Sequence, residues 1–188
     1  MGEPAVEAVE PKVQPGPAGG PVVVLIGPPG AGKTTVATAL GARTGLPVRD
    51  TDADVERVAG RTVAEIFTQS GEATFRALEH DAVATALAEH TGILALGGGA
   101  VMDERTRANL GGRRVVFLSI SMPVGVKRTG ISDQRPMFVG VNPRATFKAL
   151  LDKRLPVYRE VATVEIDTDT LTVDEVVDRI VADLGLAA

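Results

Sequence analysis

Residues 27–34 read GPPGAGKT and directly follow the apolar run VVVLI of residues 22–26. A glycine-rich loop at this point lets backbone N–H groups converge on the phosphates of a nucleotide, because few side chains stand in the way. In such a loop Lys33 carries a charge to the outer phosphates, and the hydroxyl of Thr34 can bind Mg²⁺. The helix that begins here directs the positive end of its dipole at the same anion. The pattern therefore predicts a phosphate-binding loop and disfavours an ordinary strand-to-helix turn.

The composition indicates one soluble domain without a nucleic-acid-binding surface. The chain has 188 residues, of which 44% are hydrophobic, so it can bury a core of ordinary size. Only 3% of the residues are aromatic and the net charge is -4, which argues against stacking on bases or coating a polyanion. The absence of cysteine excludes disulfides and thiolate metal sites, and no segment is typical of a signal peptide or a membrane span. We expect a cytoplasmic monomer that binds neither nucleic acid nor membranes.

Apolar runs of strand length alternate with helical patterns along most of the chain. The runs that predict strands are residues 22–26, 46–49, 93–96, 115–120 and 163–167. The helical patterns are residues 33–43, 52–90 with a break at Ser70-Gly71, 103–111, a segment that begins at Pro123, 143–158, and a last helix opened by the capping box Thr172 to Glu175. This alternation predicts an α/β fold in which helices cover a parallel sheet. Residues 1–20 are rich in Pro, Gly, Glu and Ala, so we expect a disordered tail before a single domain of residues 21–188.

Asp50 and Asp52 come directly after the second predicted strand. Two carboxylates two residues apart point the same way where the backbone stays extended, so they can serve one site. Thr51 or Asp52 could instead cap the helix that follows, which is a common role for both residue types. The phosphate-binding loop needs a carboxylate at the carboxyl edge of the sheet to hold Mg²⁺, and this need favours the site.

Arg76 and a run of three glycines could border one cleft. Arg76 lies about 100° around the helix from Phe75, at the edge of the apolar stripe, and Glu79 can pair with it at i,i+3. Taken alone, Arg76 is more typical of a solvated helix residue. The run Gly97–Gly99 follows the third predicted strand and leaves bare backbone where a small ligand could approach closely. A tight turn is the alternative, although a turn rarely needs three glycines.

Residues 127–140, KRTGISDQRPMFVG, combine basic residues with Gly, Ser, Asp and Pro and show little apolar periodicity. A segment of this kind can close over the phosphates of a nucleotide, exclude water and supply a charge during transfer. We therefore predict a mobile lid at about residues 128–141 and substrate-binding helices at about residues 51–90. An ordinary surface loop is the alternative to the lid.

These motifs, in this order and at these separations, resemble those of the shikimate kinases. The resemblance covers residues 22 to about 168 and rests on the phosphate loop, Asp50-Thr51-Asp52, Phe75-Arg76 with Glu79, Gly97-Gly98-Gly99-Ala100, Arg128-Thr129-Gly130, Arg135-Pro136 and Tyr158-Arg159. It implies a fold like that of the nucleoside monophosphate kinases, with three layers α/β/α and a five-stranded parallel sheet. It also implies transfer of the γ-phosphoryl group of ATP to the 3-hydroxyl of shikimate, a step of chorismate and aromatic amino-acid biosynthesis.

The resemblance also implies a role for individual residues. ATP would be bound by Gly30, Ala31, Gly32, Lys33, Thr34, Thr35, Arg128 and Arg135, with Arg128 along the adenine and Arg135 at the transferring phosphate. Thr34 and Asp50 would hold Mg²⁺. Asp52 would be the candidate base, and Lys33 and Arg135 the other catalytic residues. Shikimate would be bound by Arg76 and Arg159 at its carboxylate, and by Asp52, Gly97, Gly98 and Gly99 at its hydroxyls.

Two other classes of protein compete with this interpretation. A related small-molecule kinase, such as one acting on gluconate, would share the loop and the fold, but it is not expected to combine Asp52, Arg76 and the glycine run with Arg159. A GTPase switch would need a D-x-x-G motif and an [NT]-K-x-D motif, and the sequence contains neither. The chain departs from the shikimate kinase pattern at residues 167–173, which lack the basic residue and proline that often lie near the adenine.

Overall fold

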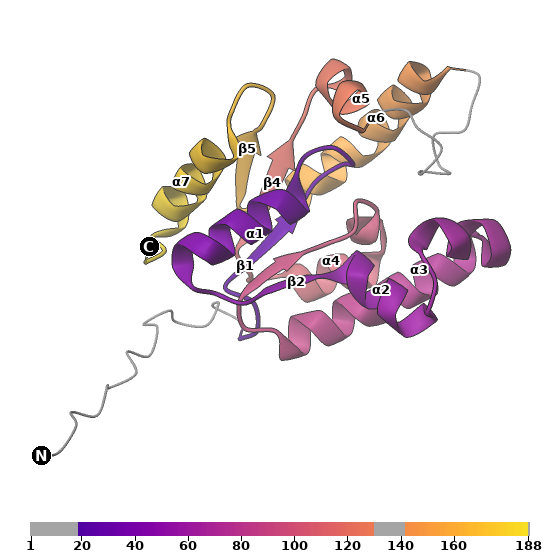
Figure 1. The fold of residues 1–188 in the computed structure, drawn as a ribbon, viewed down its shortest axis with the longest axis horizontal. Coiled ribbons are helices and arrows are strands. Elements are labelled where there is room, and N and C mark those ends of the chain that lie inside the picture. The colour runs from indigo at the N-terminus through magenta and orange to yellow at the C-terminus, as the bar shows by residue number, and fades with distance from the viewer. Residues whose placement is uncertain (1–18, 130–141, 188) are drawn as a thin grey trace, which may run out of the picture.

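The computed structural model describes residues 19–129 and 142–187. Its centre is a five-stranded sheet with the order β2-β3-β1-β4-β5, in which all neighbouring strands are parallel (Figure 1). The strands are β1 (Val23–Ile26), β2 (Val48–Asp50), β3 (Ile93–Ala95), β4 (Val115–Ser119) and β5 (Val164–Asp167). Each lies within two residues of its predicted run, so the predicted five-stranded parallel sheet is confirmed.

Helices connect the strands and complete the chain. They are α1 (Lys33–Thr44), α2 (Thr51–Ala59), α3 (Val63–Glu89), the 3-10 turn η1 (Ala100–Met102), α4 (Glu104–Leu110), α5 (Met122–Thr129), α6 (Pro143–Val161) and α7 (Val173–Leu184). The predicted capping box opens α7, because Thr172 accepts a bond from the Glu175 N–H and Glu175 accepts one from the Thr172 N–H. None of the helices in the described ranges is long and apolar enough to cross a bilayer.

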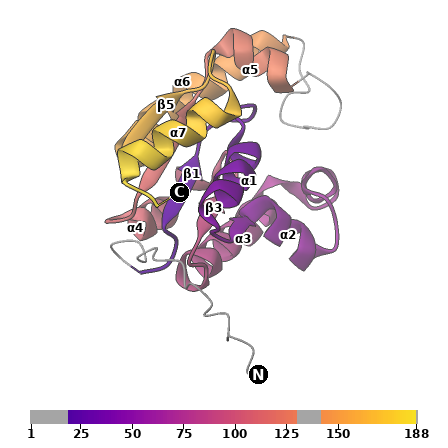
Figure 2. The same ribbon diagram turned by 60° about the vertical axis from the view of Figure 1, so that its left-hand side comes forward.

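The helices cover both faces of the sheet and so form three layers (Figures 1 and 2). On one face, α1 and α7 bury Leu40 and Ile180 against sheet residues such as Leu25. On the other face, α3 and α6 contribute Val83 and Tyr158 to a second apolar cluster. Burying one such aliphatic side chain contributes roughly 1.5–3 kcal/mol, so these two clusters fix the helices that carry the site.

The segment from α2 to α3 contains two breaks, of which the sequence predicted one. Gly71 has φ 82 and ψ 167, so α3 is kinked at the predicted break. The second break separates α2 from α3, where Gly60 ends α2 with φ 64 and Thr62 opens α3 with a capping box. The prediction of one interruption in residues 52–90 was therefore incomplete. A small apolar cluster of Val55, Ile66 and Phe75 holds α2 and the two halves of α3 together.

The strand order brings three sequence motifs to one edge of the sheet. β3 lies between β1 and β2, with Leu25 opposite Ala95 and Ala95 opposite Asp50. Because the strands are parallel, the segments that follow them leave the sheet at the same edge. The phosphate loop, the aspartates after β2 and the glycines after β3 therefore lie side by side.

Candidate active site

The loop of residues 27–34 has a conformation suited to surround an anion. Gly30 and Gly32 have φ values of 83 and 86, which side chains rarely allow, and Gly32 is the N-cap of α1. The Nζ of Lys33 donates to the carbonyls of Gly27 at 2.8 Å and Pro28 at 3.2 Å, so the ammonium lies against the loop. An anion at this loop would meet the Lys33 charge and the N-terminal end of α1 together.

Thr34 and Asp50 form a direct contact between the loop and the end of β2. The Thr34 hydroxyl donates to Asp50 Oδ2 at 2.7 Å, and Asp50 Oδ1 accepts the N–H of Asp52 at 2.9 Å. Asp50 is thus the N-cap of α2, a role that the sequence had offered to Thr51 or Asp52 as the alternative to a site. Within the described ranges no group of three or more His, Asp or Glu side chains could hold a metal. A hydroxyl and one carboxylate still fit Mg²⁺, which takes few protein ligands when phosphates and water supply the rest.

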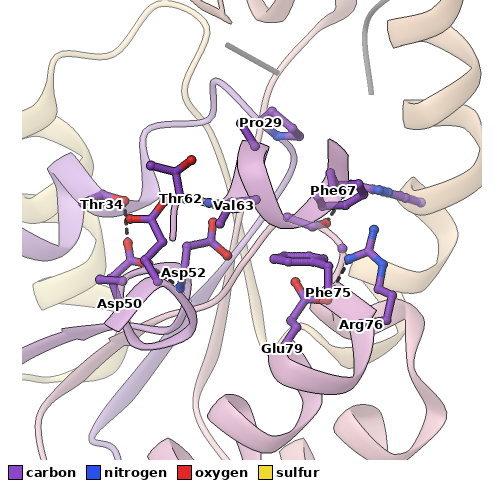
Figure 3. A pocket seen from close by; sticks show the side chains of 16 residues that line it. Pro29, Thr34, Asp50, Asp52, Thr62, Val63, Phe67, Phe75, Arg76 and Glu79 are labelled. Atoms are coloured by element: carbon purple, nitrogen blue, oxygen red, sulfur yellow. Dashed lines mark hydrogen bonds and ion pairs between the residues drawn. The ribbon is translucent and has the colours of Figure 1, made fainter. Parts of the chain in front are cut away.

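A cavity of about 820 Å³ opens beside this contact and continues to the glycine run. Its polar wall includes Thr34, Asp50, Asp52, Arg76, Glu79, Gly98, Gly99 and Arg154, and its apolar wall includes Pro29, Val63, Phe67 and Phe75. Figure 3 shows Thr34 and Asp50 at one side of this pocket, Arg76 and Glu79 at the other, and Asp52 between them. A molecule in the cavity could therefore contact the metal-ligand candidates, a carboxylate and an arginine at once.

Arg76 is held in place by charged and aromatic neighbours. Its guanidinium donates to the buried Glu79 at 2.6 Å, which confirms the predicted i,i+3 pair, and it also pairs with Glu72 at 3.2 Å. The guanidinium carbon lies 5.2 Å from the ring centre of Phe75. Burial is the largest single effect and lowers the Arg76 pKa, but the charges and hydrogen bonds of Glu79 and Glu72 together outweigh it, so the Arg76 pKa is raised. Burial likewise raises the pKa of Glu79, against the attraction of Arg76.

Charged side chains occupy the space that a Cβ atom would need at Gly97 and Gly99. A Cβ at Gly97 would lie 2.6 Å from Asp52 Oδ1 and 2.6 Å from Glu79 Oε1. A Cβ at Gly99 would clash with the Arg76 guanidinium. Among the described residues, no partner accepts a hydrogen bond from the N–H of Gly98 or of Gly99. The predicted bare backbone therefore leaves two N–H donors without a described acceptor on residues that line the cavity.

Arg154, rather than Arg159, reaches the cavity from α6. Arg154 is 9% exposed and donates to the Gly98 carbonyl at 3.0 Å. Arg159 lies about 140° further around the same helix, is exposed, and pairs with Glu165 on β5 through two bonds of 2.9 and 3.1 Å. The structure thus corrects the prediction, because it does not bring Arg159 to the pocket. The sequence did offer a signal for Arg154, which lies one helical turn before Tyr158 on the buried side.

The structure describes only one of the two arginines predicted to bind ATP. Arg128, at the end of α5, donates to the Thr168 hydroxyl at 3.1 Å and to the Thr168 carbonyl at 2.6 Å. The end of α5 therefore lies against the loop that follows β5, on the side where adenine was predicted. Arg135 falls outside the described residues, as do residues 130–141 of the predicted lid. Their roles stay predictions.

Comparisons with known proteins agree with the geometry. A family model described as Shikimate kinase matches residues 29–185. The chain is 62% identical over 161 residues to a shikimate kinase of Saccharopolyspora erythraea, an alignment that covers 86% of this chain and 92% of that protein. A solved shikimate kinase from Acinetobacter baumannii in complex with shikimate is similar with a TM-score of 0.83 and 33% identity, and the match covers 86% of this chain and 91% of that one.

The runner-up interpretation also has a structural relative. A gluconokinase from Sinorhizobium meliloti matches with a TM-score of 0.54 and 18% identity, covering 87% of this chain and 90% of that one. A likeness at this level shows a common fold alone.

Proposed function

The chain belongs to the shikimate kinase family, and from this premise we propose that it transfers the γ-phosphoryl group of ATP to the 3-hydroxyl of shikimate. The products are shikimate 3-phosphate and ADP, in a step of aromatic amino-acid biosynthesis. The observation that carries this proposal is that Thr34 and Asp50 line the same cavity as Asp52, Arg76 and Arg154. It joins a phosphate-binding loop to groups that match a small polyhydroxylated acid.

The acceptor end of the cavity matches shikimate group by group. Shikimate carries one carboxylate, for which Arg76 and Arg154 supply planar guanidinium donors. It also carries three hydroxyls, for which Asp52 can accept hydrogen bonds and the Gly98 and Gly99 N–H groups can donate them. The apolar wall formed by Phe67 and Phe75 suits the carbon ring. We assign Asp52 as the group that accepts the proton of the reacting hydroxyl.

The donor end is assigned to the loop and the start of α1. Gly30, Ala31, Gly32, Lys33, Thr34 and Thr35 would surround the phosphates of ATP, where Lys33 neutralises charge that develops during transfer. Arg128 is proposed to border the adenine beside Thr168, since its side chain is already fixed there. Arg135, in the predicted lid, would reach the transferring phosphate.

We propose that Thr34 and Asp50 would hold Mg²⁺, which would neutralise negative charge on the phosphates of ATP. The 2.7 Å contact between these side chains supports the proposal, because it brings two oxygen atoms suited to Mg²⁺ together at the phosphate loop. We also propose a monomeric enzyme, because one chain supplies the whole described pocket, and one that works in the cytoplasm, where ATP is available.

Replacing Asp50 with asparagine should raise the Mg²⁺ concentration needed for half-maximal activity by about 10-fold or more, because a charged metal ligand is lost. Asparagine is as good an N-cap as aspartate, so α2 should keep its cap and the melting temperature should change little. The measurement is a Mg²⁺ titration of the rate at saturating ATP and shikimate, with thermal unfolding in parallel. An unchanged titration curve would exclude Asp50 from the metal site.

The acceptor can be identified by following ADP release with shikimate, gluconate and nucleoside monophosphates offered separately. We expect kcat/KM for shikimate to exceed that for every other acceptor by at least about 10⁴-fold, because a site built for a carboxylate and hydroxyls leaves buried groups unpaired with the wrong ligand. A preference for gluconate would instead support the runner-up function. ³¹P NMR of the product would show which oxygen is phosphorylated.

Arg154→Ala and Arg159→Ala form a matched pair on one helix. Arg154→Ala should raise the KM for shikimate by about 10- to 100-fold, because it removes a charged hydrogen-bond partner of the carboxylate. Arg159→Ala should leave this KM within about twofold, because it removes only the exposed pair with Glu165. Steady-state kinetics in both substrates checks the pair, with the KM for ATP expected to stay constant. The reverse pattern would restore the original assignment of Arg159.

A further inference from the structure

The three glycines at the end of β3 are held from two sides by hydroxyl groups that do not line the cavity. On one side, the N–H of Gly97 donates to the Thr51 hydroxyl at 3.1 Å. Thr51 is the first residue of α2 and is 0% exposed, so this bond is sealed from water. It ties the segment that carries Asp52 to the start of the glycine run, although the two bonded residues are 46 positions apart.

On the other side, the carbonyl of Gly98 accepts the phenol of Tyr158, and it also accepts Arg154. Tyr158 is 1% exposed, and its ring stacks on Phe117 of β4 with ring centres 4.9 Å apart. Burial raises the pKa of Tyr158 to about 12, so the phenol remains a proton donor at neutral pH. With both of these bonds formed, the Gly98 carbonyl has no lone pair to turn toward a ligand.

The direction of these bonds sets the direction of the unpaired N–H groups. In a trans peptide the C=O of one residue and the N–H of the next point opposite ways. The Gly98 carbonyl is drawn toward α6, so the N–H of Gly99 is directed away from it. The Gly97 carbonyl accepts the Ala100 N–H at 3.1 Å, which directs the N–H of Gly98 in the same manner. Rotation of either peptide would remove a donor from the cavity wall.

We propose that Thr51 and Tyr158 are positioning residues for the acceptor: their hydroxyls clamp the glycine run so that its N–H groups meet the hydroxyls of a small polyol acid. Neither side chain lines the cavity, so neither would touch the acceptor. The Thr51 bond also ties the first residue of α2, next to Asp52, to the start of the glycine run. This inference rests on the proposed function, because it takes shikimate as the acceptor.

The test compares Thr51→Val and Tyr158→Phe, which remove only the hydroxyls, with the wild-type enzyme. We expect the KM for shikimate to rise about 10-fold in Thr51→Val, which leaves a buried N–H unpaired, and about 3- to 5-fold in Tyr158→Phe, which leaves Arg154 on the carbonyl. The KM for ATP should stay within twofold in both. Thr51→Ser restores the hydroxyl and should restore the KM for shikimate.

Thr163→Val is the matched control at the opposite edge of the sheet. The exposed Thr163 hydroxyl accepts the Val115 N–H at 3.0 Å and donates to the Val115 carbonyl at 2.9 Å, so this variant also loses hydroxyl bonds to the backbone, at a residue that does not line the cavity. It should lower the melting temperature by about 2–4 °C at most, and by less than Thr51→Val does, because water reaches the exposed Thr163 hydroxyl, and it should change neither KM. An equal rise in the KM for shikimate in Thr163→Val, or a joint rise in both KM values in Thr51→Val, would overturn the clamp.

Two further measurements separate the clamp from the proposed function. The wild-type rate with shikimate tests the function, whereas amide hydrogen exchange at residues 97–99 tests the clamp without any acceptor. Exchange there should be faster in Thr51→Val and Tyr158→Phe than in wild type and Thr163→Val. Unchanged exchange and unchanged KM for shikimate in Tyr158→Phe would refute the proposal even if Thr51→Val failed to fold.

Discussion

Lys33→Ala should lower kcat by about 10³-fold or more at saturating ATP, the largest loss expected for any single substitution in the donor site. Phosphoryl transfer has little covalent chemistry for side chains to perform, so charge neutralisation and positioning supply most of the rate. The Lys33 ammonium lies at the loop, 2.8 Å from the Gly27 carbonyl, where the phosphates of ATP are proposed to bind. Alanine removes this charge and the hydrogen-bond donors of the ammonium, and leaves only the backbone N–H groups of the loop.

The control for Lys33→Ala is Lys148→Ala, which removes one ammonium from the exposed pair with Asp152 on α6. The control should keep wild-type kcat, because an exposed pair of this kind contributes about 0.2–1 kcal/mol at most. Calorimetric titration with shikimate should show that Lys33→Ala still binds the acceptor, since Lys33 does not line the acceptor cavity. If Lys33→Ala turned over within tenfold of wild type, the phosphate loop would have no part in catalysis.

The sheet and its covering helices follow from local patterns, and for that reason the sequence predicts them well. β1 and β4 are almost continuous apolar runs because they are buried on both faces, and such runs can be recognised from the local sequence alone. The break at Gly71 is also local, since a positive φ of 82 requires glycine. The break between α2 and α3 was missed because the helical periodicity of residues 52–90 continues across Gly60.

The site was predicted less completely because its parts meet through distant pairings. The pair of Arg76 and Glu79 was predictable, since both lie on one helix face at i,i+3. The bond from Gly97 to Thr51 joins residues that follow two different strands, β3 and β2, and no local pattern marks a buried threonine as its acceptor. The choice between Arg154 and Arg159 depends on how α6 is rotated against the sheet. The burial of Tyr158 on Phe117 decides that rotation, and only the packed structure shows it.

Asp52→Asn should lower kcat by about 10²-fold or more if Asp52 accepts the proton of the reacting hydroxyl. Asp52 lines the cavity between the metal-ligand candidates and Arg76 (Figure 3). Asparagine keeps the shape of the side chain and can still bind a hydroxyl, so the KM for shikimate should change much less than kcat. Steady-state kinetics in both substrates would measure kcat and this KM separately.

Asp54→Asn is the control that separates a lost base from a lost charge on α2. Asp54 lies two residues further along the helix and pairs with Arg49 at 2.6 Å, away from the lining of the cavity. The same substitution there should keep kcat within about twofold, since asparagine can still accept from Arg49. A near-normal kcat in Asp52→Asn would limit Asp52 to orienting the acceptor, and the rate would then depend on Lys33, Mg²⁺ and Arg135. A loss in both variants would instead trace the effect to the stability of α2, which thermal unfolding would show directly.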